Sequence, residues 1–287
     1  MSSSSHRSDH SDADGDPAIL DSSAQKVWTR CGSGQMVWRS WGRGAPLLLL
    51  HGAFGSWTHW IRNINRLSSS YRVVAPDLPG LGDSDLPSEP YDAEAVVAIL
   101  AAGVDAVVGK DQAYDLAGFS FGGVIASALA ATHHRRVRSL TLVSTGGLGT
   151  ARNSIPSANW RSASSADDER QAHRDNLAAM MLSSGAAIDD LAVSLQQENA
   201  RRSRLRTQPM SKSGLLQQSL PRATCAIAAI YGKGDAMLGD HLEEVEARLR
   251  HLTPLRAFAI VPEAGHWLQY ERPEAFEATL VASMSAG

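Results

Sequence analysis

The sequence predicts an α/β fold in which a mostly parallel sheet is flanked by helices, with one helical insertion. Short apolar runs typical of buried strands alternate along the chain with helical stretches such as 93–108. Segment 148–216 interrupts this alternation, because it is rich in Ala, Ser, Gln, Asn and Arg and contains no convincing strand. It has helical periodicity in places, so we expect it to form the insertion.

Composition favours a single soluble enzyme domain. A chain of 287 residues fits one α/β domain with an insertion, and a net charge of −3 gives no footprint for nucleic acid. Two cysteines, Cys31 and Cys225, have neither a metal-ligand nor a C-x-x-C spacing. No apolar run is long enough to span a bilayer. We therefore expect a small-molecule substrate, no nucleic-acid or membrane partner, and no metal or cofactor. The oligomeric state is left open.

The N-terminal residues 1–24 are expected to form a disordered tail. The first part mixes Ser, His, Asp and Arg and has no hydrophobic periodicity. It also lacks the apolar segment of a secretory signal, so the default expectation is a cytoplasmic protein.

A G-x-S-x-G motif follows the apolar run 114–117 and precedes an alanine-rich helical stretch, 123–132. The serine is Ser120, and the strand, sharp turn and helix around it are the context of a nucleophile elbow. Such a tight turn crowds its neighbours, so glycines are needed on both sides of the serine. The alternative is an ordinary surface turn serine.

An acid and a histidine follow in sequence, each just beyond a predicted strand. Asp235 lies after the apolar run 227–231, and His266 lies after the run 258–261 and before a final helix, 273–283. Asp235 could instead be a turn former or a helix N-cap, and Asp240 lies nearby. The order serine, acid, histidine differs from the orders in chymotrypsin and subtilisin.

From about Gln35 to the C-terminus, the chain resembles proteins of the α/β-hydrolase fold. Residues 51–55 (HGAFG) resemble the family's oxyanion loop, and residues 77–84 (DLPGLGDS) resemble its D-x-x-G-x-G-x-S turn. The resemblance implies a core of 25–147 and 217–287. It also implies that 148–216 is a helical cap inserted after the sixth strand, which shapes the substrate pocket.

The resemblance also implies a serine hydrolase mechanism. Ser120 would attack a carbonyl carbon, His266 would take its proton, and Asp235 would orient the imidazole and stabilise its cation. Backbone N–H groups would stabilise the oxyanion, one from Phe121 and one from Ala53 or Phe54. Four cap arginines, Arg201, Arg202, Arg204 and Arg206, form either a solvated helix face or a source of a cation for a substrate carboxylate.

Two segments, 57–64 and 265–271, resemble meta-cleavage product hydrolases, which split carbon–carbon bonds in ring-fission products. Phe119 and His59 stand where that group commonly has asparagine. We expect Gly52, His59, Phe119 and Trp267 to line the substrate pocket, although the aromatic residues could equally be core. Hydrolysis of a small, aromatic-derived carboxylic ester is therefore weighed slightly above carbon–carbon bond hydrolysis. A slow-turnover ligand-binding receptor is a third alternative. Haloalkane dehalogenases and epoxide hydrolases are disfavoured because they need a carboxylate nucleophile.

Overall fold

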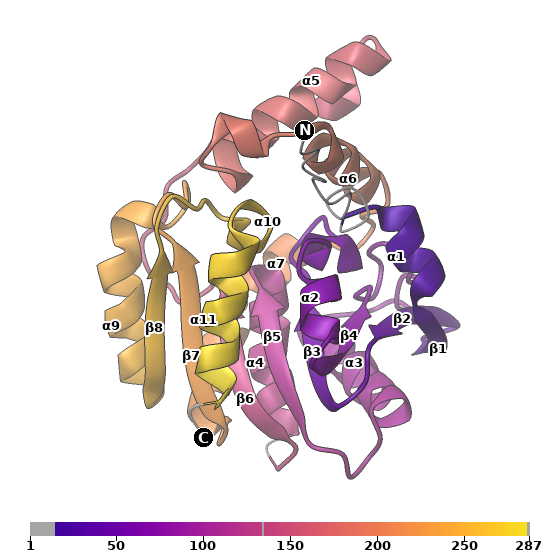
Figure 1. The fold of residues 1–287 in the computed structure, drawn as a ribbon, viewed down its shortest axis with the longest axis vertical. Coiled ribbons are helices and arrows are strands. Elements are labelled where there is room, and N and C mark those ends of the chain that lie inside the picture. Colours follow the sequence, from indigo (N-terminus) through magenta and orange to yellow (C-terminus); the bar gives the residue numbers. More distant parts are fainter. Residues whose placement is uncertain (1–14, 134, 286–287) are drawn as a thin grey trace, which may run out of the picture.

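The computed structural model describes residues 15–133 and 135–285, which fold around an eight-stranded sheet (Figure 1). The strands lie in the order β1-β2-β4-β3-β5-β6-β7-β8. The pairs β1/β2 and β2/β4 are antiparallel, and the strands from β4 to β8 run parallel. The bounds are β1 (Gln25–Cys31), β2 (Gly34–Trp41), β3 (Ala45–Leu50), β4 (Tyr71–Pro76), β5 (Tyr114–Phe119), β6 (Val137–Val143), β7 (Ala226–Gly232) and β8 (Leu255–Val261).

Helices cover both faces of the sheet and bury its apolar side chains. One face packs against α3 (Ala93–Val107), α4 (Phe121–Thr132) and α9 (Leu242–Leu252). The other packs against α2 (Ile64–Ser68), α10 (Leu268–Glu271), α11 (Pro273–Ser285) and the 3₁₀ helix η1 (Trp57–Trp60). The prediction of a mostly parallel sheet between helices is confirmed.

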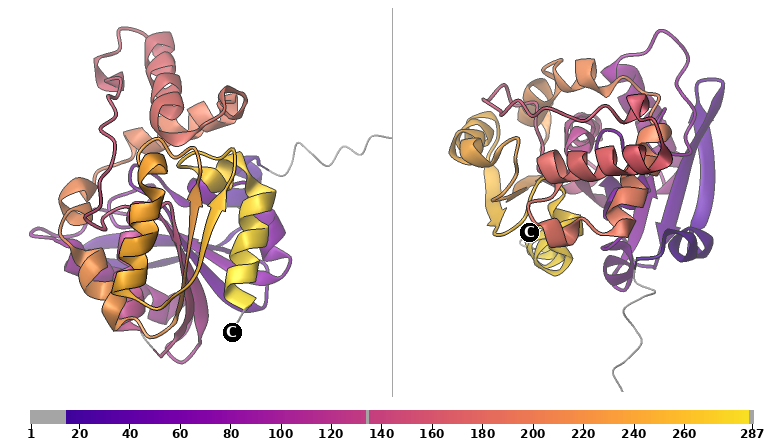
Figure 2. Two further views of the ribbon diagram at one scale, coloured as in Figure 1. Left: turned by 90° about the vertical axis from the view of Figure 1, so that its left-hand side faces the viewer. Right: turned by 90° about the horizontal axis from the view of Figure 1, so that it is seen from above.

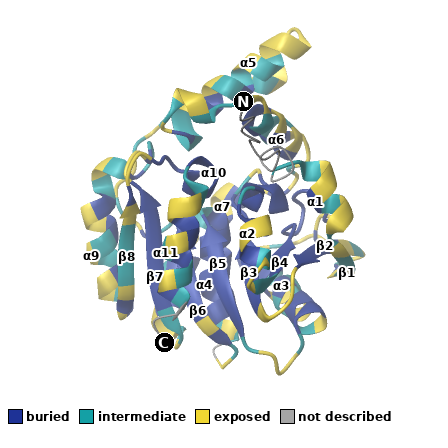
Figure 3. Cartoon of the chain, viewed as in Figure 1, coloured by how far each residue is buried: buried dark blue, intermediate teal, exposed yellow. Residues whose placement is uncertain are grey.

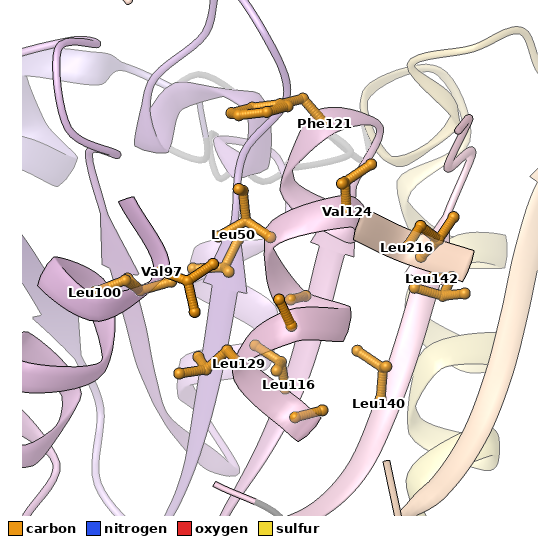
Figure 4. Close-up of a cluster of buried hydrophobic side chains, with 14 of the residues drawn as sticks. Leu50, Val97, Leu100, Leu116, Phe121, Val124, Leu129, Leu140, Leu142 and Leu216 are labelled. Carbon is orange, nitrogen blue, oxygen red and sulfur yellow. The ribbon is translucent and has the colours of Figure 1, made fainter. Parts of the chain in front are cut away.

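The core is divided by the sheet into two apolar clusters because successive side chains of a strand point to opposite faces. In β3, Leu48 and Leu50 belong to the cluster around α3 and α4, whereas Leu47 and Leu49 belong to the other. Figure 4 shows part of the first cluster, with side chains of β3, β5, β6 and α4 pointing toward one another. The central strands are buried over most of their length (Figure 3). The site described below is therefore built on a rigid support.

Part of the expected N-terminal tail is ordered, which corrects the boundary set at residue 24. Residues 17–23 form helix α1 (Pro17–Ser23), and Asp16 caps it by accepting a bond from Ala18 N at 2.8 Å. Leu20 is 2% exposed, and its carbonyl oxygen accepts a bond from Trp41 Nε1 at 2.9 Å. One apolar side chain buried in the second core cluster outweighs the polar composition that suggested disorder. Residues 1–14 lie outside the described part of the chain.

The insertion after the sixth strand contains helices and no strand among its described residues. The elements of 148–216 are η2 (Trp160–Ser162), α5 (Ala166–Asn176), the π-helix η3 (Leu177–Met181), η4 (Gly185–Ala187), α6 (Asp190–Arg201) and α7 (Thr207–Ser211). Helix α8 (Leu215–Ser219) begins within this range, and η5 (Leu220–Arg222) follows it before β7. Figure 2 shows α5 and α6 beyond one end of the sheet, with α5 lying across the molecule when it is seen from above. Helices α7 and α8 instead pack against α4.

The described residues also bear on the membrane question. Between residues 15 and 133 and between 135 and 285, no helix combines the length and the apolar character needed to cross a bilayer.

Candidate active site

Ser120 occupies the sharp turn between β5 and α4, with φ of 51° and ψ of −115°. Its N–H is held by Val143 O at 2.8 Å. The flanking glycines are required by close backbone contacts. A Cβ at Gly118 would lie 2.5 Å from Gly122 O, and a Cβ at Gly122 would lie 2.4 Å from Leu50 O. The steric reason for the glycines of the motif therefore holds in the structure.

Asp235 and His266 meet at the ends of the neighbouring strands β7 and β8. His266 Nδ1 donates to Asp235 Oδ2 at 2.7 Å, and the two residues are 4% and 2% exposed. The other carboxylate oxygen of Asp235 accepts bonds from Met237 N at 3.0 Å and Leu238 N at 3.2 Å. Because an ionised carboxylate only accepts, the proton lies on Nδ1, and Nε2 is left as the basic nitrogen.

Asp240, the alternative acid, makes a different contact. Asp240 is exposed and accepts a long bond of 3.4 Å from Asn153 Nδ2. Asp235 also has the turn-forming role considered for it, because its side chain binds two backbone N–H groups of the following turn. The two roles use different oxygens of one carboxylate, so they coexist.

Sheet topology brings the serine and the histidine to the same edge. β5, β6, β7 and β8 are parallel neighbours, so the loops that follow β5, β7 and β8 all leave at the carboxyl ends of strands. The ring of Phe119, the residue before Ser120, lies 5.1 Å from the ring of His266 between centroids. Ser120 is partly exposed, whereas His266 is buried. Ser120 is therefore the more accessible of the two residues.

Two segments near Ser120 contain candidate backbone donors for an oxyanion. Phe121 is the first residue of α4, so its N–H has no partner within the helix. The loop after β3 lies against the elbow, since a Cβ at Gly52 would come within 3.3 Å of Ser120 Cβ. Gly52 N donates to His59 Nδ1 at 3.2 Å and is thus already used. This leaves Ala53 and Phe54 as the loop's candidate oxyanion donors, and Phe54 has a positive φ of 52° with a half-exposed side chain.

The four residues expected to line the pocket lie together around His59. The His59 ring is 5.2 Å from the Phe119 ring and 5.1 Å from the Trp267 ring between centroids. His59 also accepts Gly52 N at its Nδ1. Trp267 is fully buried, stacks on Tyr270 at 4.2 Å, and donates from Nε1 to His59 O at 2.8 Å. Trp267 therefore fixes His59 by a hydrogen bond to its backbone and by packing against its ring.

His59 is neutral and has one defined tautomer. Burial lowers its pKa well below 6.5, and the nearby His51 and His266 lower it further. Because Nδ1 accepts the Gly52 N–H, the ring proton is on Nε2. His59 thus offers a neutral donor beside the site, where an asparagine would offer both a donor and an acceptor.

The supporting roles of two residues were not predicted from the sequence, although Asp77 belongs to the D-x-x-G-x-G-x-S turn noted there. Asp77 is fully buried and accepts bonds from Trp57 N at 2.8 Å, Asp83 N at 3.0 Å and Arg39 Nη1 at 3.0 Å. These bonds hold the loop after β4 against η1. An arginine within the apolar strand 34–41 was the available signal for a buried ionic network. The role of Glu271 was likewise not predicted.

The four arginines of the insertion mostly form ion pairs or hydrogen bonds with other residues of the chain. Three of the four bind protein oxygens: Arg201 pairs with Glu169 at 2.7 Å, Arg202 pairs with Asp83 and with Glu198, and Arg204 donates to Ser84 O at 2.6 Å. Arg206 is exposed. The pairing of Arg202 with Asp83 and of Arg204 with Ser84 O ties the insertion to the loop after β4. These contacts favour structural roles over recognition of a substrate carboxylate.

Comparison with known proteins agrees with this architecture. A 2-hydroxymuconate semialdehyde hydrolase from Pseudomonas sp. (strain CF600) is 40% identical over 110 residues, which cover 37% of this chain and 38% of that protein. A pimeloyl-(acyl-carrier protein) methyl ester esterase from Aeromonas hydrophila is 38% identical over 120 residues, 40% of this chain and 43% of that protein. The chain thus spans about two fifths of the length of these two relatives. A 2-hydroxy-6-oxo-6-phenylhexa-2,4-dienoate hydrolase from Burkholderia cepacia is 25% identical over 261 residues, with 86% and 90% covered.

Solved structures share the fold at lower sequence identity. A meta-cleavage product hydrolase from Pseudomonas fluorescens IP01 has a TM-score of 0.72 at 23% identity and covers 90% of this chain and 96% of its own. An esterase from Rhodococcus sp. ECU1013 has a TM-score of 0.68 at 23% identity, with 92% and 99% covered. The family model described as "Alpha/beta hydrolase family" matches residues 47–279, and the chain belongs to that family.

Proposed function

We propose that the protein is a serine hydrolase that acts on a small, aromatic-derived carboxylic ester. The observation that carries this proposal is the 2.7 Å bond between His266 Nδ1 and Asp235 Oδ2 at the sheet edge where Ser120 occupies the strained turn. This arrangement leaves His266 Nε2 free to accept the proton of the Ser120 hydroxyl. Asp235 is fixed by two backbone donors, so it can hold the imidazole in one orientation.

The reaction proceeds through an acyl-enzyme. Ser120 Oγ bonds to the ester carbonyl carbon while His266 takes its proton, and the oxyanion is stabilised by Phe121 N–H and by Ala53 or Phe54 N–H. Collapse breaks the bond to the alkoxide, which leaves as an alcohol with the proton from His266. Water then attacks the acyl carbon while His266 takes one of its protons. Breakdown of this second intermediate releases the carboxylic acid, and His266 returns the proton to Ser120 Oγ.

The neutral environment of the site suits an uncharged ester. Phe119 is 1% exposed and lies against His266, and His59 is held neutral. The cap arginines are paired elsewhere, so we assign no role in substrate charge recognition to Arg201, Arg202 or Arg204. These groups provide general acid–base catalysis by His266 and stabilisation of the oxyanion, which is what ester hydrolysis needs.

Purified protein assayed with a short-chain p-nitrophenyl ester tests the proposal. Ser120→Ala and His266→Ala should each lower turnover by about 10⁴-fold or more, and the double variant should be little worse than either. Additive losses, or ester turnover that survives in Ser120→Ala, would contradict a serine mechanism.

A second candidate is hydrolysis of a carbon–carbon bond in a 2-hydroxy-6-oxo-dienoate. The observation that favours it is the similarity to the Burkholderia cepacia dienoate hydrolase over 86% of this chain. The same assay includes such a dienoate, and fast loss of the dienoate with slow ester turnover would favour this candidate. Phe119→Asn combined with His59→Asn restores the two amides common in that group, and a shift of relative activity toward the dienoate would show that these positions set the preference.

A further inference from the structure

Glu271, the last residue of α10, is a buried carboxylate with four hydrogen bonds. Oε2 accepts from Gly265 N at 2.6 Å and from Ser183 N at 3.1 Å. Oε1 accepts from Ser184 N at 2.7 Å and from Ser183 Oγ at 2.8 Å. The residue is only 7% exposed. All four donors are neutral groups, and they come from two segments that are far apart in sequence.

One of these segments carries the proposed base, because Gly265 immediately precedes His266. The other belongs to the insertion, where Ser183 and Ser184 follow the π-helix η3. Oε2 bridges the two segments directly, since Gly265 N and Ser183 N share it. Glu271 therefore connects the loop of His266 to the insertion through one carboxylate.

A second contact joins the same two segments on the other side of His266. Trp267 N donates to Met181 O at 2.8 Å. The approach is close, since a Cβ at Gly265 would lie 2.7 Å from Ser183 N and 2.8 Å from Met181 O. Trp267, after His266, is thus bonded directly to the insertion, whereas Gly265, before it, is linked to the insertion through Glu271 Oε2. Movement of segment 181–184 would be transmitted to the imidazole.

The local helix form adds a reason to expect such coupling. η3 is a π-helix turn, and its last backbone bond runs from Leu182 N to Leu177 O at 2.9 Å. π-helical turns are rare and occur frequently at functional sites. Here the π-helical turn places Met181, Ser183 and Ser184 next to the loop that carries His266.

We propose that Glu271 is a positioning residue, which holds His266 in register with Ser120 by tying the histidine loop to the insertion. The inference rests on the serine mechanism proposed above. Buried carboxylates need their bonds satisfied, and losing one oxygen leaves N–H donors unpaired. Glu271→Gln exchanges one acceptor oxygen for an NH₂ group that faces two donors, so it should displace the loop without removing side-chain volume.

A fluorophosphonate probe measures the outcome independently of the natural substrate. Ser120 Oγ forms a bond to phosphorus as the P–F bond breaks, fluoride leaves, and His266 takes the hydroxyl proton. The second-order rate of labelling at Ser120, located by mass spectrometry, therefore reports on the catalytic serine and its activation by histidine without requiring the natural substrate. We expect Glu271→Gln to lower this rate by about 10- to 100-fold, because small misplacement of a reacting group has effects of this size.

Two controls separate positioning from general effects. Glu263→Gln removes a carboxylate from the same loop, where Glu263 is 80% exposed and pairs with Arg272 at 2.9 Å. Arg202→Gln removes a different tie between the insertion and the core, the pair with Asp83. Both should label within about twofold of the unmodified protein, because exposed ion pairs contribute little. On an ester substrate, Glu271→Gln should lower kcat and leave KM within about twofold, because bound geometry and not binding is disturbed.

The outcomes are distinguishable. Failure of the unmodified protein to label at Ser120 would overturn the proposed serine mechanism itself. Normal labelling of the unmodified protein with an unchanged rate in Glu271→Gln would overturn only the positioning role, as would an equal loss in Arg202→Gln. If Glu271→Gln does not fold, Ser183→Ala removes one donor of the four, and a labelling rate that stays within experimental error of the unmodified protein would overturn the inference.

Discussion

Substitution of Ser120 can separate the backbone strain of the elbow from its chemistry. The residue has φ of 51° and ψ of −115°, a conformation that glycine adopts readily and that other residues occupy at a cost of roughly 1–3 kcal/mol. Ser120→Ala removes the hydroxyl but keeps Cβ and the strain. Ser120→Gly removes both. The pair of variants therefore differs in strain while both lack the nucleophile.

The expected magnitude follows from two opposing contributions. Glycine relieves the strain of roughly 1–3 kcal/mol. It also increases the conformational freedom of the unfolded chain, which lowers stability by about 0.4–1 kcal/mol relative to alanine. We expect Ser120→Gly to be more stable than Ser120→Ala by about 1 kcal/mol in the free energy of unfolding. Both variants should lack ester turnover.

Urea unfolding of both variants at 25 °C, with m-values compared, measures this difference. Ser127 gives the matched control because it is fully buried within α4 and lies in the regular part of that helix. There, glycine should be less stable than alanine by about 1 kcal/mol, which is the opposite sign. If Ser120→Gly were as stable as Ser120→Ala or less stable, the reasoning from strain would be refuted.

Three further predictions concern the support of the site. Gly122→Ala should destabilise the fold by at least about 3 kcal/mol or prevent folding, because the new Cβ would meet Leu50 O at 2.4 Å; soluble expression and urea midpoints measure this. Trp267→Phe should cost about 1–3 kcal/mol in unfolding free energy, since His59 O loses its 2.8 Å donor and a gap remains. The pKa of His59 is lowered in the folded state, so the unfolded chain binds the extra proton and stability should fall as pH drops below 6.5. His59→Gln should reduce that slope by up to about 1.4 kcal/mol per pH unit, and urea titrations at several pH values that show an unchanged slope would contradict it.

The glycine-flanked turn at Ser120 and several strands of the sheet were predictable from the sequence for a physical reason. Buried parallel strands are continuous apolar runs, so 46–50, 114–117 and 227–231 stand out from their surroundings. The glycines around Ser120 are required by contacts within the motif itself and with the adjacent strand β3. Patterns of this kind depend on residues that are close together in the sequence, and the structure has the corresponding strands β3, β5 and β7.

The contacts that depend on distant segments were not predictable. No residue close to Leu20 in the sequence indicates that Leu20 packs in the core or that its carbonyl oxygen bonds to Trp41. The residues of helix α1 were therefore expected to be disordered. Glu271 lies in a segment noted for its resemblance to other hydrolases, yet its partners Ser183 and Ser184 are nearly ninety residues away. A side chain's burial is decided by the element that covers it, and the sequence does not state which element that is.

The choice between ester and carbon–carbon bond cleavage depends on how many polar functions the pocket presents. Departure of an alcohol needs only one proton from His266, and the oxyanion donors belong to the backbone. Departure of a carbon fragment also requires proton delivery to carbon, and the dienoate adds a carboxylate and a hydroxyl or oxo group that need partners. In this chain, residue 119 is a phenylalanine and offers no polar group. The Nδ1 atom of His59 already accepts the Gly52 N–H, so these two residues together offer one neutral donor, His59 Nε2. At these two positions a dienoate would find fewer polar partners than two asparagines would offer, and this difference favours the ester.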